Sequence, residues 1–84
     1  MLDEFIEHLK EVKEEVLEHH SAFVRKNFTN ALRECEESLE SALSMVGGLF
    51  LHDFMSMEEY VSMTQTLLSA HAKYLDFIEG KIPD

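Results

Sequence analysis

The chain has 84 residues, one cysteine, and 17 acidic against 7 basic side chains. A chain this short is expected to form one small domain over residues 1–84, and without disulfides it needs tight helix packing, a metal or self-association for stability. The acidic balance disfavours direct binding to nucleic acids or to anionic membranes. No apolar run is long enough to cross a bilayer, and the N-terminus lacks the basic start of a signal peptide, so we expect a cytoplasmic protein.

An amphipathic pattern predicts the first helix over residues 2–27. The chain has no glycine and no proline before Gly47, which disfavours a β fold because hairpins need turn residues. Side chains three and four residues apart form the predicted buried face: Leu2, Phe5, Leu9, Val12, Val16, His19 and Phe23. The acidic face lies opposite and consists of Glu4, Glu7, Glu11, Glu14 and Glu18.

The second predicted helix starts near residue 30, after a break at residues 27–30. Arg25 and Lys26 suit the C-terminal end of a helix, where the dipole is negative, and Thr29 or Asn30 can cap the next helix. The predicted buried face of this second helix is Leu32, Cys35, Leu39, Ala42 or Leu43, and Val46.

The end of the second helix stays open between two positions. Stopping at Val46 leaves the pair Gly47–Gly48 in a loop together with several large apolar side chains. Continuing through the pair to about Phe54 costs roughly 2 kcal/mol relative to alanines. That continuation gives three helices of similar length, which an antiparallel bundle favours.

The third predicted helix covers residues 56–79. Ser56 and Glu59 have the S-x-x-E spacing of a capping box. Gly80 is predicted to end the helix in the left-handed conformation, and Pro83 prevents its continuation. The predicted buried face is Met57, Val61 or Tyr60, Thr64, Leu68, His71, Leu75 and Ile78.

These elements predict an all-α fold, a three-helix antiparallel up-down-up bundle, with a long two-helix hairpin as the alternative. The segment 43–63 holds more apolar side chains than one small bundle can easily bury, and it is rich in methionine, which suits adaptable binding surfaces. We therefore expect a homodimer or higher oligomer; the alternatives are that these side chains close one end of the monomer's own core or form a surface for a foreign protein partner. The predicted interaction surface comprises Leu49, Phe50, Phe54, Met55 and Met57.

Little in the sequence indicates chemistry. His19, His71 and Cys35 are residue types that bind zinc, and the predicted bundle brings them to similar heights. No C-x-x-C or H-E-x-x-H spacing supports a metal, so we interpret the histidines as a polar core layer and Cys35 as a small hydrophobe. We expect no cofactor, no metal ligand and no catalytic residue, and therefore no enzymatic activity.

The leading functional hypothesis is a small, non-enzymatic interaction or regulatory module that acts as a homo-oligomer. An alternative is a decoy whose acidic face imitates a nucleic-acid backbone and blocks a basic groove on a partner protein. A third hypothesis is a metal- or pH-responsive helical sensor built on His19 and His71.

Overall fold

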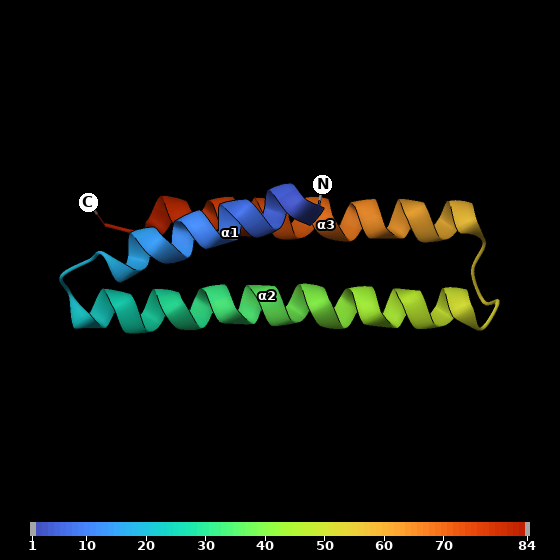
Figure 1. The fold of residues 1–84 in the computed structure, drawn as a ribbon, viewed down its shortest axis with the longest axis horizontal. Coiled ribbons are helices and arrows are strands. Elements are labelled where there is room, and N and C mark those ends of the chain that lie inside the picture. The colour runs from blue at the N-terminus through green and yellow to red at the C-terminus, as the bar shows by residue number, and fades with distance from the viewer. Residues whose placement is uncertain (1, 84) are drawn as a thin grey trace.

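The computed structural model of the protein describes residues 2–83, which form three α-helices joined by short turns. The helices are α1 (Leu2–Leu17), α2 (Ala22–Leu51) and α3 (Met57–Lys81). Helix α2 runs antiparallel to α1 and α3, which contact each other and point in the same direction (Figure 1). The predicted three-helix up-down-up bundle is therefore confirmed, and the described residues contain no strand.

The turn between α1 and α2 lies at residues 18–21, so the predicted break at residues 27–30 is wrong. Ser21 has an extended backbone, and its hydroxyl accepts a hydrogen bond from the Val24 N–H at 3.3 Å, which caps α2. Arg25 donates from its guanidinium Nη1 to the His19 carbonyl at 2.5 Å. The basic side chain that suggested a helix end therefore stabilises the preceding turn instead.

Helix α2 continues through Gly47–Gly48 and ends at Leu51. Its end is a Schellman motif, in which the Phe54 N–H bonds to the Leu49 carbonyl at 3.0 Å. Asp53 occupies the left-handed position with φ 61°, where glycine is more usual. With 16, 30 and 25 residues, the three helices do not have the similar lengths that the sequence predicted.

The start of α3 follows the prediction. The Ser56 hydroxyl accepts a hydrogen bond from the Glu59 N–H, and the Glu59 carboxylate accepts one from the Ser56 N–H, both at 3.1 Å. These two bonds complete the capping box and lower the pKa of the Glu59 carboxyl. The predicted left-handed cap at Gly80 is wrong, because no glycine has a positive φ and α3 continues to Lys81.

The core runs along the faces that the apolar spacing predicts. Its buried members are Phe5, Leu9, Val12, Val16, Leu32, Cys35, Leu39, Leu68, Leu75 and Ile78. Phe23 is 77% exposed and Val24 is buried instead, because the earlier break shifts the helical phase at the start of α2. No helix within residues 2–83 combines the length and apolar character that crossing a bilayer requires.

Helix α1 covers only part of the α2–α3 hairpin. Its N-terminal end lies near the middle of the molecule, which measures 49 × 17 × 16 Å (Figure 1). Phe5 in its first turn and Leu68 of α3 line the same surface hollow. Residues 45–64, which we call the distal hairpin, extend beyond this point with only two helices packed together.

Candidate interaction surface and side-chain clusters

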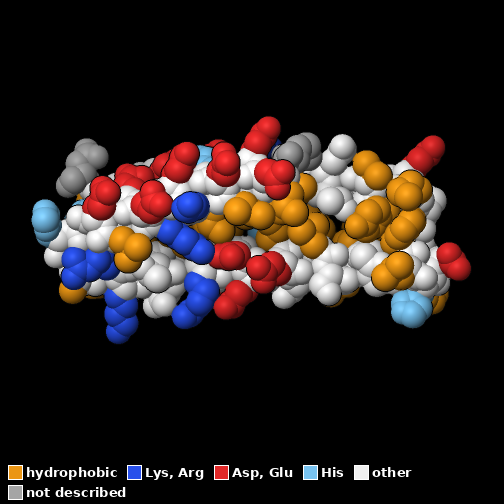
Figure 2. Space-filling view, viewed as in Figure 1, with side chains coloured by type: hydrophobic (Ala, Val, Ile, Leu, Met, Phe, Trp, Pro, Cys, Tyr) orange, Lys and Arg blue, Asp and Glu red, His pale blue; other side chains and the backbone are white. Residues whose placement is uncertain are grey.

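The distal hairpin carries large apolar side chains on its surface. Of the five residues of the predicted interaction surface, Phe54 is 79%, Met57 59% and Leu49 39% exposed, whereas Phe50 and Met55 are half-buried. Other exposed apolar residues in the same segment are Met45, Leu51, Val61 and Met63. Figure 2 shows hydrophobic side chains gathered on this half of the molecule.

On α3, the exposure of Met57 and Val61 follows from the short length of α1. On α3 the apolar positions Met57 and Val61 continue the face that includes the buried Leu68. Helix α1 ends before it reaches them, so the same side of α3 is core at one end and surface at the other. Inside the hairpin, the rings of Phe50 and Tyr60 stack with centroids 4.7 Å apart and hold α2 against α3.

Most of the distal hairpin carries no charged side chain. No aspartate, glutamate, lysine or arginine occurs between Ser41 and Leu51 or between Tyr60 and Ala72. The charges within it are Asp53, Glu58 and Glu59, all near the α2–α3 turn. Acidic side chains instead gather along α1 in the other half of the molecule (Figure 2).

The two glycines of α2 serve no packing need within the chain. A Cβ atom added at Gly47 or Gly48 would meet nothing within 4 Å. Glycine in a helix interior costs about 1 kcal/mol relative to alanine. The fold therefore retains two destabilising residues beside open space, on the same segment that exposes Met45 and Leu49.

The five glutamates of the acidic face are exposed, as the sequence predicts. They lie on α1 and at the start of the turn after it: Glu4, Glu7, Glu11, Glu14 and Glu18. Lys10 lies among them and shares a shallow hollow with Glu7, Glu11 and Glu14. The Lys13 ammonium forms an ion pair with the Glu36 carboxylate of α2 at 2.6 Å. This cation therefore links α1 to α2 and is not paired with a glutamate of the acidic face.

The structure does not bring His19 together with His71 and Cys35. His19 lies in the α1–α2 turn, where its Nδ1 accepts a hydrogen bond from the Ser21 N–H at 3.2 Å. His71 lies 2.7 Å from the Leu67 carbonyl through Nδ1 and 3.1 Å from the Ser38 hydroxyl through Nε2. A carbonyl only accepts, so Nδ1 carries a proton and donates it to the Leu67 carbonyl. His71 is half-buried and bonds to its neighbours, but His19 lies in the turn, so the two histidines do not form the polar core layer that the sequence predicts.

Cys35 is buried beside this histidine. Its Sγ lies 3.9 Å from the His71 carbonyl, and burial, followed by the nearby Glu36 carboxylate, raises the pKa of the thiol. A nucleophilic cysteine needs the opposite shift, because the thiolate is the reactive form. The environment of Cys35 is that of a packed hydrophobe.

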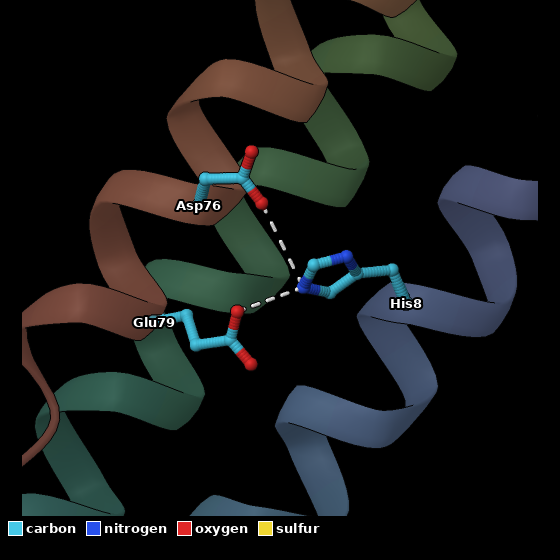
Figure 3. A group of neighbouring side chains, drawn as sticks. All are labelled: His8, Asp76 and Glu79. Atoms are coloured by element: carbon cyan, nitrogen blue, oxygen red, sulfur yellow. Dashed lines mark hydrogen bonds and ion pairs between the residues drawn. The ribbon is translucent and has the colours of Figure 1, made fainter.

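A different cluster lies between α1 and α3 and was not predicted. His8 of α1 points toward Asp76 and Glu79 of α3 (Figure 3). Its Nε2 is 3.0 Å from Glu79 Oε1 and 3.8 Å from Asp76 Oδ1. The signals in the sequence are the three-residue spacing of two carboxylates on one helix and the parallel direction of α1 and α3. Neither signal identifies His8 unless the axial register of α1 on α3 is already known.

A comparison of the chain with models of protein families, with curated proteins and with solved structures finds no match.

Proposed function

We propose that this protein is a small helical interaction module that works as a homodimer, with the distal hairpins of two copies packed on each other. The observation that carries the proposal is the unequal coverage of the hairpin, since α1 shields one half and leaves apolar side chains of the other half in water. A second distal hairpin would cover this half with two helices in place of α1. The product is a four-helix arrangement of the kind that buries such faces.

The distribution of charge supports a second copy as the occupant. Each chain carries a net charge of −10, so two copies repel one another over most of their surface. In the distal hairpin the charged side chains lie only near the α2–α3 turn, and contact along the rest of it keeps the two acidic α1 helices apart. An acidic partner would find no complementary charge on this surface.

The glycine pair supports close contact between helices. Small residues allow two helix backbones to approach, and the space beside Gly47 and Gly48 is open in the single chain. A two-fold axis near these glycines would place the same patch of each copy against the other, as the commonest dimer symmetry requires.

Sedimentation equilibrium tests the proposal with two phenylalanine variants. Phe54 and Phe23 are 79% and 77% exposed, but they lie at opposite ends of the molecule. The wild-type chain is expected to shift with concentration from its 9.7 kDa mass to twice that mass. Phe54→Ser should raise the dissociation constant by at least about tenfold, because the lost burial occurs in both copies.

Phe23→Ser is the matched control and should leave the dissociation constant unchanged. A wild-type chain that stays monomeric at all concentrations, or equal weakening by the two variants, would overturn the proposed dimer.

The acidic decoy is a second candidate function, favoured by the exposure of all five glutamates on one side of α1. In this role the glutamates replace phosphates in the basic groove of a nucleic-acid-binding protein. Changing Glu7, Glu11 and Glu14 together to lysine should abolish capture of such a protein from a native lysate. Retention of the same protein by the triple variant would eliminate the decoy function.

A further inference from the structure

We infer that His8, Asp76 and Glu79 form a binding site for a divalent transition-metal ion of the zinc class, which ties α1 to α3. The inference rests on geometry, charge and donor type, and it is independent of the proposed dimer because all three ligands belong to one chain. Figure 3 shows the three side chains converging from the two helices.

The geometry is close to what a metal needs. One ligand atom from each residue lies within 4.8 Å of the other two, and the imidazole Nε2 is 3.0 and 3.8 Å from the two carboxylates. Ligands at the usual zinc distances of about 2.0–2.2 Å lie roughly 3.3–3.6 Å apart in a tetrahedron. An ion is therefore accommodated by small rotations of side chains, with the helices in place.

The charge of the cluster favours a cation. Within residues 2–83 the ion-pair partner of Asp76 and Glu79 is His8, which is cationic only when protonated. The nearby Lys81 ammonium lies over the Phe77 ring, 5.2 Å from its centroid. When the imidazole is neutral, the two carboxylates repel each other, and the ion pairs of the cluster include no permanently charged cation. A divalent ion would neutralise both carboxylates.

The donor set selects the type of metal. Carboxylates alone suit Mg²⁺ and Ca²⁺, whereas an imidazole ligand favours zinc and its neighbours in the first transition row. Glu4, one turn before His8, lines the same hollow as His8 and Asp76 and adds negative charge beside the cluster. The three cluster side chains are all partly exposed, so an ion reaches them from solvent.

Binding of the ion would join two helices that lie far apart in the sequence, because the ligands come from residues 8 and 76–79. An isolated helix of 16 residues is only marginally stable in water. The metal would hold α1 on α3 and raise the stability of the whole bundle, because an ion that binds only the folded chain shifts the folding equilibrium.

Equilibrium dialysis with Zn²⁺ and thermal unfolding test the inference on tag-free chain. Wild type should bind one Zn²⁺ per chain and gain about 5–10 °C in Tm at a free Zn²⁺ concentration about ten times the dissociation constant. His8→Gln, and separately Glu79→Gln, should weaken binding by at least about tenfold. Circular dichroism of each variant without metal verifies that its helices form.

His20→Gln and Glu11→Gln are the matched controls, because both residues are exposed and lie outside the cluster. These variants should bind Zn²⁺ as the wild type does. The inference is overturned if His8→Gln binds Zn²⁺ normally, if the stoichiometry is one ion per two chains, or if Mg²⁺ at equal concentration raises Tm as much. A monomeric wild type that still binds one Zn²⁺ would contradict the dimer and leave the metal site intact.

Discussion

The buried thiol of Cys35 should contribute measurably to the pH dependence of the free energy of unfolding. The folded state raises the pKa of the thiol through burial, and then through the neighbouring Glu36. The folded chain therefore holds this proton more tightly than the unfolded chain does. Its contribution to stability is complete below the ordinary thiol pKa, near 8.5, and is lost as the pH rises toward the raised value of the folded state.

Cys35→Ala should remove this dependence. At pH 7 the variant is less stable than the wild type, because the substitution leaves a cavity beside Leu32 and Leu39 in the core. Above about pH 8.5 the difference should shrink, since only the wild type loses the contribution of the thiol. Urea unfolding at pH 7, 8, 9 and 10, at one protein concentration, measures it. A difference that stays constant over this range would show that folding leaves the thiol pKa unchanged.

Individual core residues are the part of this molecule that sequence reasoning predicted best. Leu32, Leu39 and Leu75 are buried where the three- and four-residue spacing places them, because periodicity is a property of one helix and needs no knowledge of its neighbours. Met57 and Val61 follow the same spacing and are exposed. Periodicity identifies the apolar face of a helix, whereas the length of another element decides whether that face is covered.

At the scale of elements, the capping box of α3 was predictable and the start of α2 was not. Ser56 and Glu59 form a local, reciprocal pattern. Ser21 caps α2 alone, because Val24 occupies the position where a glutamate would complete a box. The three- and four-residue spacing of apolar side chains also continues almost without interruption from α1 through the turn into α2. The prediction consequently placed the break nine residues late, at residue 27 instead of 18.

Two substitutions distinguish the observed cap from the predicted one. Ser21→Ala removes the hydroxyl that accepts the Val24 N–H and should lower the free energy of unfolding by about 1 kcal/mol. Thr29→Ala is the matched control in the predicted break. Thr29 is exposed inside α2, so its replacement should leave stability unchanged or raise it by a few tenths of a kcal/mol. Urea unfolding with the reverse order of losses would place the helix start near residue 30.

At the scale of the whole molecule, the position of one turn determines both surfaces of interest. The register of α1 on α3 brings His8 level with Asp76 and Glu79, and the same register leaves residues 45–64 uncovered. A break nine residues late shifts a helix by roughly 13 Å along its axis. The cluster of His8, Asp76 and Glu79 could not be found from a sequence reading with that error. The apolar segment 43–63 could, because its composition does not depend on register.

The incomplete coverage by α1 predicts a gradient of local stability along the hairpin. Backbone hydrogen bonds of residues 32–39 lie in the three-helix core, whereas those of residues 47–51 and 57–63 lie where two helices pack alone. Local opening is easier where fewer apolar contacts must break. In dilute solution, amide hydrogen exchange should therefore be faster at residues 47–51 and 57–63 than at residues 32–39.

Protein concentration should reduce this gradient if two distal hairpins pack together. Residues 47–51 and 57–63 are expected to gain protection as the dimer forms, and residues 32–39 should change little because they are already covered within the chain. Phe54→Ser should keep the gradient at every concentration, since it weakens the contact between copies. Uniform protection in the dilute wild type would mean that two helices are as stable alone as three. Protection that rises equally along the chain would mean that the copies meet elsewhere than at residues 45–64.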